Sequence, residues 1–175
     1  MVMRLKPIIR KGQRGDAQNL VALAMQVWLH NYAKDGISSV LSSFVLSEFT
    51  VENFTAFLTS SSTTILVAEV SEHLVGYARI DVGMSCPEST ISKVQLATLY
   101  VQEHFTGKGV GNALLAEAET LACKRMATPL WLTVNAMNNR AIAFYAKHGH
   151  TKVGITQFRL GDNDHENLVL VGNEA

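Results

Sequence analysis

The sequence contains few cysteines and no surplus of charge of either sign. The two cysteines, Cys86 and Cys123, fit neither a C-x-x-C pair nor a zinc-ligand spacing, so no metal site is expected. Cys123 falls within a helical pattern and is expected to be a small core residue. Fifteen basic and fifteen acidic residues balance to a net charge of zero. This balance removes the usual electrostatic argument for binding nucleic acid or a membrane surface, and neither partner is expected.

Long apolar runs are also missing. No stretch approaches the length of a membrane span, and the N-terminal residues MVMRLKPIIRKG lack the apolar core of a secretory signal. The sparse cysteines favour a reducing compartment, so a cytoplasmic protein is expected. The chain has no internal repeat, low-complexity tract or linker, and 47% of its 175 residues are hydrophobic. These features are typical of a single globular domain covering residues 1–175.

Strand and helix patterns alternate along the chain. The predicted strands cover residues 5–10, 64–70, 74–82, 93–101, 130–134, 151–160 and 167–171. The predicted helices run from an N-cap at Asp16 to about Tyr32, from Val110 to about Met126, and from an N-cap at Asn138 to Gly149, with one or two short helices within residues 34–61. This interleaved order favours a mixed α/β sheet of about seven strands with flanking helices.

The stretch from Leu96 to Leu115, LATLYVQEHFTGKGVGNALL, has the most distinctive pattern. A β-prone run is followed by glycines at three alternate positions, and the pattern then becomes helical. Glycines let successive backbone N–H groups turn toward one point, and a new helix adds its own unpaired N–H groups and the positive end of its dipole. The stretch therefore predicts a site that holds a phosphate group.

Two common nucleotide-binding motifs do not fit the glycine turn. A P-loop has the pattern G-x-x-x-x-G-K-[ST]. Lys108 is not followed by Ser or Thr, and no glycine stands five residues before Gly107. A dinucleotide-binding fold requires G-x-G-x-x-G and an acidic residue roughly twenty positions later. Here the third glycine comes one position early, and residues 124–127 contain no carboxylate.

The turn instead resembles the acetyl-CoA-binding segment of the GNAT family of N-acetyltransferases, with LYV, a short spacer, GKGVG and then ALL. A second stretch is similar to that family's N-x-x-A-x-x-F-Y-x-x-x-G-F segment, through Leu132, Val134, Asn138, Arg140-Ala141-Ile142, Phe144-Tyr145 and Gly149. More narrowly, the chain resembles the bacterial spermidine and polyamine acetyltransferases, through Trp28, Tyr32 and the tail that begins FRLGD at Phe158. The resemblance implies a GNAT fold and acetyl-CoA as co-substrate.

The resemblance also implies roles for individual residues. Acetyl-CoA would lie in a gap where two parallel strands, residues 93–101 and 130–134, part from each other. Tyr145 would protonate the departing thiolate of CoA, and Asn138 would cap its helix and touch the pantetheine arm. The other expected cofactor-binding residues are Leu99, Tyr100 and Val101 on the strand and Thr106, Gly107, Lys108, Gly109, Val110, Gly111 and Asn112 in the turn.

A general base is harder to assign. A primary ammonium has a pKa near 10.4, so presenting the free amine at pH 7 costs about 4–5 kcal/mol unless a base or a desolvated site helps. Many relatives carry a carboxylate just before the LYV triplet, where this chain has Gln95 and Ala97. The alternatives are Asp81, Glu103, Glu69 and His30. His30, Tyr32 and Asp81 are the residues expected to contact the acceptor, although the sequence alone favours His30 as a cation at a helix C-terminus or as a surface residue.

The expected activity is direct transfer of an acetyl group from acetyl-CoA to a primary amine of a small molecule in a ternary complex, with a polyamine as one candidate acceptor. Two alternatives remain open. The missing strand carboxylate is compatible with a module that binds acyl-CoA as a sensor and has lost catalysis. The acceptor could also be the N-terminus or a lysine of a protein. A homodimer is a further expectation, in which residues 168–171 would pair across the interface.

Overall fold

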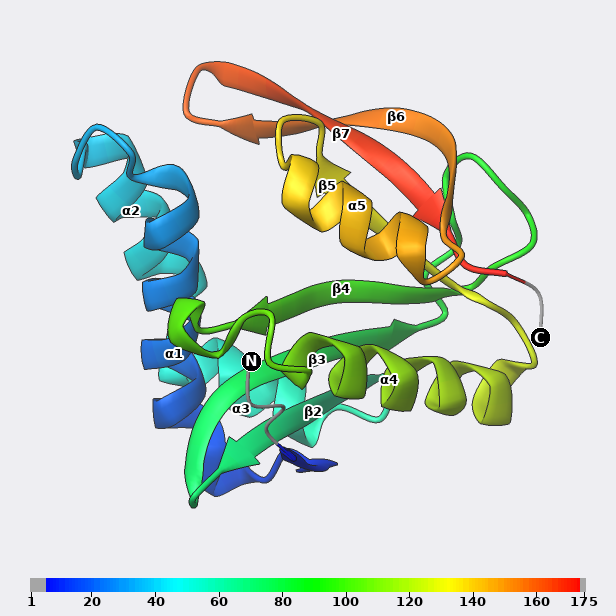
Figure 1. The fold of residues 1–175 in the computed structure, drawn as a ribbon. Coiled ribbons are helices and arrows are strands. Elements are labelled where there is room, and N and C mark those ends of the chain that lie inside the picture. The colour runs from blue at the N-terminus through cyan, green and yellow to red at the C-terminus, as the bar shows by residue number, and fades with distance from the viewer. Residues whose placement is uncertain (1–5, 174–175) are drawn as a thin grey trace. The chain divides into compact units, whose positions relative to one another are not determined.

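The computed structural model describes residues 6–173, whose backbone forms two compact units. The first unit contains residues up to Arg79 together with residues 98–117, and the second contains residues 80–97 and those from 118 onward. The chain therefore passes between the units within β3, β4 and α4, whose bounds are given below (Figure 1).

Seven strands form one hydrogen-bonded sheet in the order β1-β2-β3-β4-β5-β7-β6. They are β1 (Ile8–Lys11), β2 (Thr63–Val70), β3 (His73–Val82), β4 (Val94–Val101), β5 (Leu130–Asn135), β6 (Thr151–Leu160) and β7 (Asn163–Val171). β4 and β5 are parallel, whereas β1–β2, β5–β7 and β6–β7 are antiparallel. The predicted mixed sheet of about seven strands is confirmed. The predicted first strand begins at Leu5, which lies outside the described residues.

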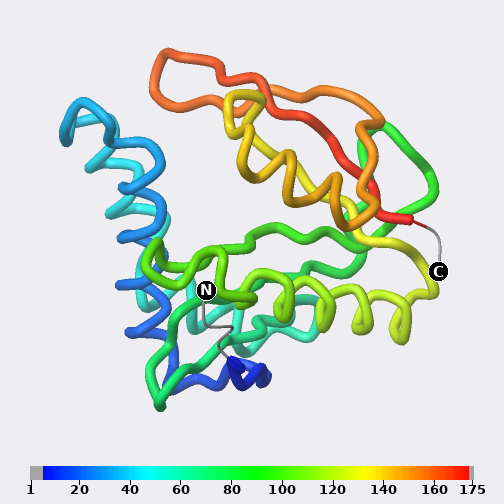
Figure 2. The backbone as a smooth tube through the Cα atoms, viewed as in Figure 1, coloured from blue at the N-terminus to red at the C-terminus, as the bar shows by residue number. Residues whose placement is uncertain are grey.

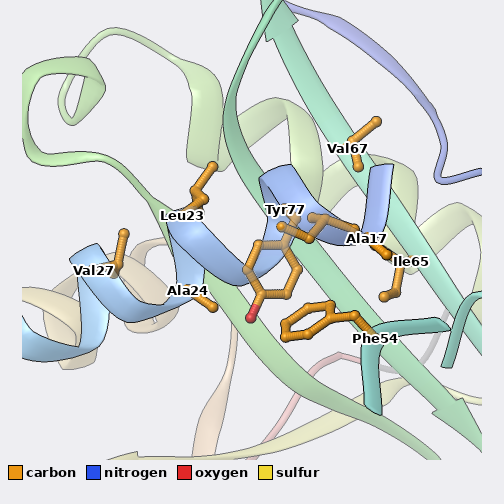
Figure 3. Close-up of a cluster of buried hydrophobic side chains, with 9 residues drawn as sticks. Ala17, Leu23, Ala24, Val27, Phe54, Ile65, Val67 and Tyr77 are labelled. Carbon is orange, nitrogen blue, oxygen red and sulfur yellow. The ribbon is translucent and has the colours of Figure 1, made fainter. Parts of the chain in front are cut away.

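Three helices of the first unit build its core against the strands. They are α1 (Ala17–Tyr32), α2 (Ser39–Glu48) and α3 (Val51–Thr59), and the short 3-10 helix η1 (Arg14–Asp16) precedes them. Figure 3 shows side chains of α1, Phe54 of α3 and Ile65 and Val67 of β2 gathered around the ring of Tyr77. The Tyr77 and Phe54 rings meet edge to face, with centroids 5.8 Å apart. This core fixes the first unit's β3 residues against α1.

A partly buried ion-pair network joins β1, β2 and the start of α1. Arg10 donates to both carboxylate oxygens of Asp16, at 2.8 and 2.9 Å, and its Nη2 lies 2.6 Å from Oε1 of Glu69. Asp16 occupies the predicted N-cap position of α1, but its side chain makes no capping bond there, because it accepts from Arg10 and from the Gln13 N–H. These bonds hold the pKa of Asp16 below its usual value. Glu69 is thus committed to a structural contact.

The second unit contains the remaining strands, α5 (Asn139–Lys147) and the later half of α4 (Val110–Met126). Trp131 packs with Cys86, Val169 and Val171, and its indole N–H donates to the Met84 carbonyl at 2.7 Å. Figure 2 traces the long β6–β7 hairpin in orange and red. The hydrogen-bonded ladder of this hairpin continues to the pair Leu160–Asn163, and only Gly161 and Asp162 form the turn. β7 therefore begins four residues before the predicted strand at 167–171.

Two expectations from the sequence are wrong. Cys123 is exposed rather than part of the core. The buried positions of α4 include Leu114, Leu115, Ala118 and Ala122, and Cys123, one residue further on, points away from that face. Residues 168–171 cannot pair across a dimer as a free edge, because they pair with β5 on one side and with β6 on the other.

No helix within the described part of the chain has the length and apolar composition required to cross a membrane.

Candidate active site

The strand that precedes the glycine turn is held against β3 within the first unit. Leu99, Tyr100 and Val101 are the last residues of β4, and all three are half-buried. The Gln102 N–H that follows donates to the Val75 carbonyl of β3 at 3.0 Å. Gly76 lies so close to β4 that a Cβ there would be 2.7 Å from the Tyr100 carbonyl oxygen. The absence of a side chain at Gly76 therefore sets the path of the β4 backbone.

Replacing Gly76 by Ala is expected to lower the melting temperature and to weaken acetyl-CoA binding together, since the added methyl must push the Tyr100 carbonyl out of place. Thermal unfolding and a binding titration measure the two effects. Gly15→Ala is a matched control, because a Cβ at Gly15 meets nothing within 4 Å. Unchanged acetyl-CoA affinity in the Gly76 variant would mean that the Tyr100 backbone plays no part in binding.

The glycine turn has the geometry of an anion site. Gly107 and Gly109 have φ angles of 71° and 97°, a region that L-residues with side chains rarely adopt. The Gly109 carbonyl accepts from the Ala113 N–H at 3.0 Å, which starts the hydrogen bonding of α4. The N–H groups of the first turn, Val110, Gly111 and Asn112, have no partner within the helix. Together with the helix dipole, these donors suit a phosphate or pyrophosphate.

Two side chains of the turn make local contacts. The Thr106 hydroxyl donates to the Glu103 carbonyl at 2.7 Å, closing the 3-10 helix η2 (Glu103–Phe105). The Lys108 ammonium lies over the Phe105 ring, 5.6 Å from its centroid. The turn can therefore offer an anion its backbone donors, with the charge of Lys108 nearby.

The end of α1 lies against the segment that links β4 to the glycine turn. Gln102 donates to the side-chain oxygen of Gln26 at 2.5 Å, and His30 Nε2 is 3.7 Å from Glu103 Oε2. Trp28 stacks on Tyr32 and on Phe44 of α2, with ring centroids 4.5 and 4.7 Å apart. The structure thus brings the predicted acceptor residue His30 beside this segment, and it places Tyr32 in the aromatic cluster with Trp28 and Phe44. Asp81 lies near the end of β3, where it is half-buried.

Tyr100 and Tyr77 add buried hydroxyl groups to the same region of the first unit. Their rings meet edge to face, with centroids 5.6 Å apart. Burial raises the pKa of each tyrosine well above its usual value, and Tyr32 raises that of Tyr100 further. Both hydroxyls stay protonated at any pH at which the protein would work, so neither tyrosine can act as a base.

The second unit presents Asn138 and Tyr145 on α5. The Asn138 side-chain oxygen accepts from the Ala141 N–H at 3.1 Å, so the predicted N-cap is confirmed. Tyr145 is 8% exposed and packs edge to face against Phe144 and His150, with centroids 5.2 and 5.5 Å apart. In the second unit, parallel pairing of β4 with β5 covers the two pairs Val94–Leu130 and Gln95–Trp131.

His150 was not identified from the sequence, although it stands where the family segment ends in Phe. Its side chain is buried, and neither ring nitrogen has a hydrogen-bond partner among residues 6–173. Burial lowers its pKa below the usual value, and the nearby backbone of His148 and Tyr145 offsets only part of that effect. A neutral imidazole therefore supports the Tyr145 ring at neutral pH.

Replacing His150 by Phe is expected to raise the melting temperature, because a buried nitrogen without a partner costs about 1–3 kcal/mol. The gain should be larger at pH 5.5 than at pH 7.5. Since the folded pKa is depressed, His150 adds no protonation penalty to folding above its unfolded value near 6.5. Below that pH the unfolded state binds a proton that the folded state does not, so the wild type loses further stability as the pH falls toward the folded value. Thermal unfolding of both proteins at the two pH values measures the difference in melting temperature between the variant and the wild type. A difference that does not change with pH would contradict the depressed pKa of His150.

No group of three or more His, Cys, Asp or Glu side chains among residues 6–173 is arranged to hold a metal ion.

The mixed seven-stranded sheet with its parallel strand pair and flanking helices is the fold of acyl-CoA-dependent acetyltransferases. The family model of the acetyltransferase (GNAT) family matches residues 32–150. The chain belongs to this family, and it is an acetyl-CoA-dependent N-acetyltransferase.

Individual relatives cover nearly the whole chain. An uncharacterized N-acetyltransferase of Mycobacterium tuberculosis is 31% identical over 156 residues, which is 89% of this chain and 96% of the relative. A spermidine N(1)-acetyltransferase of Thermoplasma acidophilum is 24% identical over 93% of this chain and 94% of the relative. The crystal structure of PaiA N-acetyltransferase from Thermoplasma acidophilum, in complex with coenzyme A, has a TM-score of 0.78 at 21% identity and covers 97% of this chain and 99% of that one.

Proposed function

We propose that the chain acts as a single domain, residues 1–175, which transfers the acetyl group of acetyl-CoA to a primary amine of a small molecule in a ternary complex. The observation that carries this proposal is the glycine turn, where two glycines at positive φ lead directly into α4. Its backbone donors suit the pyrophosphate of acetyl-CoA, and a solved structural neighbour, the PaiA protein, holds coenzyme A.

Most of the assigned residues bind acetyl-CoA. Gly107, Gly109, Gly111 and Asn112 hold the pyrophosphate through their N–H groups, and Lys108 adds charge. The backbone of Leu99 to Val101 pairs with the pantetheine arm, and an N–H donor there stabilises the negative charge that develops on the acetyl oxygen. Thr106 and Val110 complete the turn, and Asn138 fixes the start of α5.

Tyr145 acts as the general acid. The amine nitrogen forms a bond to the acetyl carbon, the carbon–sulfur bond breaks, and the sulfur takes the proton of the Tyr145 hydroxyl. The packing of Phe144 and His150 against the Tyr145 ring supports this role, because it restricts the direction in which the hydroxyl can point.

A polyamine is the acceptor we favour, since a relative that matches 93% of this chain is a spermidine N(1)-acetyltransferase. His30, Tyr32 and Asp81 are the residues we assign to the acceptor. The test is release of free CoA thiol on incubation with acetyl-CoA and a panel containing spermidine, a simple monoamine and a peptide with a free N-terminus. Spermidine should give the fastest release. Fastest release with the peptide would instead support a protein acetyltransferase.

A sensor that binds acyl-CoA without catalysis is the second candidate, because Gln95 and Ala97 stand where relatives carry a carboxylate. Both functions predict that acetyl-CoA raises the melting temperature. At an acetyl-CoA concentration of a hundred times Kd, the free energy of unfolding should rise by about 2.7 kcal/mol. Only the enzyme releases thiol above the background measured without amine. Stabilisation without release for every amine in the panel would favour the sensor.

A further inference from the structure

The pair formed by His30 and Glu103 lies where the cofactor strand ends. Gln26 and His30 are one turn apart on the same face of α1, and they contact the consecutive residues Gln102 and Glu103. The His30 and Glu103 side chains are 54% and 49% exposed, so water or a substrate can reach both. Glu103 opens η2 directly after β4, within a few residues of the Leu99–Val101 backbone.

The proposed reaction needs a group that removes a proton from the acceptor, since an alkyl ammonium has no lone pair with which to attack the acetyl carbon. β4 offers no carboxylate for this task, because Gln95 and Ala97 occupy the positions before Leu99. Glu69 is excluded by its geometry, since its carboxylate is bound to Arg10 at 2.6 Å. Among the four bases that the sequence suggested, the structure places two, His30 and Glu103, in contact with each other.

We propose that His30 is the proton acceptor for the amine and that Glu103 is its positioning residue. This inference rests on the proposed function. His30 Nδ1 takes one proton from the ammonium, directly or through water. Glu103, whose carboxylate faces Nε2 on the other side of the ring, stabilises the resulting imidazolium, as a carboxylate does for the histidine of a catalytic triad. The freed amine attacks the acetyl carbon. The nitrogen loses two protons overall. One leaves through His30 to solvent, and the other replaces the proton that the Tyr145 hydroxyl gives to the sulfur.

Histidine suits this role because its ordinary titration lies between pH 5 and 8, where a base can both accept a proton and return it to solvent. Within the described residues, Glu103 makes the ion-pair contact with the His30 ring, and Lys34 donates to the His30 carbonyl at 2.7 Å. The titratable groups on the elements next to this end of α1 are Tyr32, Lys34, Asp35, Glu48, Glu52, Tyr100, Glu103 and His104.

The test compares the pH dependence of amine kcat/KM in the wild type, His30→Gln and Glu103→Gln, with His104→Gln as a matched control from the same exposed segment. At pH 7, His30→Gln should lower kcat/KM by about 10²-fold. The loss should shrink as the pH approaches 10, because the amine then deprotonates in solution. Glu103→Gln should lower kcat by roughly tenfold and leave the KM for the amine near the wild-type value, since the imidazolium loses its carboxylate partner while the acceptor contacts remain. His104→Gln should match the wild type.

Each variant is also titrated with acetyl-CoA to establish that it folds and binds the co-substrate. If kcat/KM for the amine in His30→Gln follows the wild type at every pH, His30 is not the proton acceptor. A loss of kcat/KM that is equal at pH 7 and pH 10 would also overturn the assignment. A wild-type protein that binds acetyl-CoA but acetylates no amine would overturn the proposed function, and this inference with it. Wild-type activity that His30→Gln leaves unchanged would overturn this inference alone.

Discussion

Tyr145→Phe is expected to lower kcat by about 10²- to 10⁴-fold, the usual contribution of a positioned general acid. Without the hydroxyl, the thiolate must leave unprotonated or take its proton from water. Acetyl-CoA affinity should stay near the wild-type value, because the ring and its contacts with Phe144 and His150 remain. Steady-state kinetics with saturating acetyl-CoA, together with a binding titration, separate the two quantities.

Tyr77→Phe is the matched control for the Tyr145 variant. It removes a hydroxyl from another buried tyrosine, in the core of the first unit. Stability can fall in this control, but kcat should stay within a few-fold of the wild type. If Tyr145→Phe keeps wild-type kcat, Tyr145 is not the acid, and its burial serves packing alone.

The second large effect is expected at Gly109. Its φ of 97° is costly for any residue with a Cβ, and the left-handed region costs an ordinary L-residue about 1–2 kcal/mol. Gly109→Ala should therefore turn the backbone donors of the loop away from their common point. Because each donor that misses the pyrophosphate also loses a charge-assisted hydrogen bond, the Kd for acetyl-CoA should rise by roughly 30-fold or more. Calorimetric titration measures this change.

Gly83→Ala separates backbone strain from loss of binding. Gly83 also has a positive φ, 87°, and a Cβ there would meet nothing within 4 Å. This control should lose stability to a similar extent yet bind acetyl-CoA like the wild type. Equal affinity in both variants would remove the glycine turn from the proposed site.

Local patterns in the sequence were sufficient to place most elements of the fold. The glycines before α4 and the Asn138 cap of α5 act on adjacent backbone, so residue type and spacing predict the two helix starts. The strand β6 was predicted with the bounds that the structure gives. Asp16 marks the start of α1 as expected, but its partner, Arg10, lies in another element, and a local pattern carries no information about that choice.

The features missed by sequence reasoning depend on contacts between distant residues. Gly76 looks like an unremarkable strand glycine until β4 is seen beside it. His30 and Glu103 are far apart along the chain, and only the packing of α1 on the segment after β4 joins them. His150 could have been noticed as a departure from the aromatic residue of the family segment, although its burial without a partner required the structure.

The most direct test of the account is an amide-resolved NMR titration of the labelled protein with acetyl-CoA. We expect saturable shifts, and slower hydrogen exchange, at the N–H groups of Gly107, Gly109, Gly111 and Asn112. The turn of the β6–β7 hairpin at Gly161–Asp162 should remain unchanged. No saturable change at millimolar acetyl-CoA, or changes that leave the glycine turn untouched, would contradict the claim that this turn holds the pyrophosphate of acetyl-CoA.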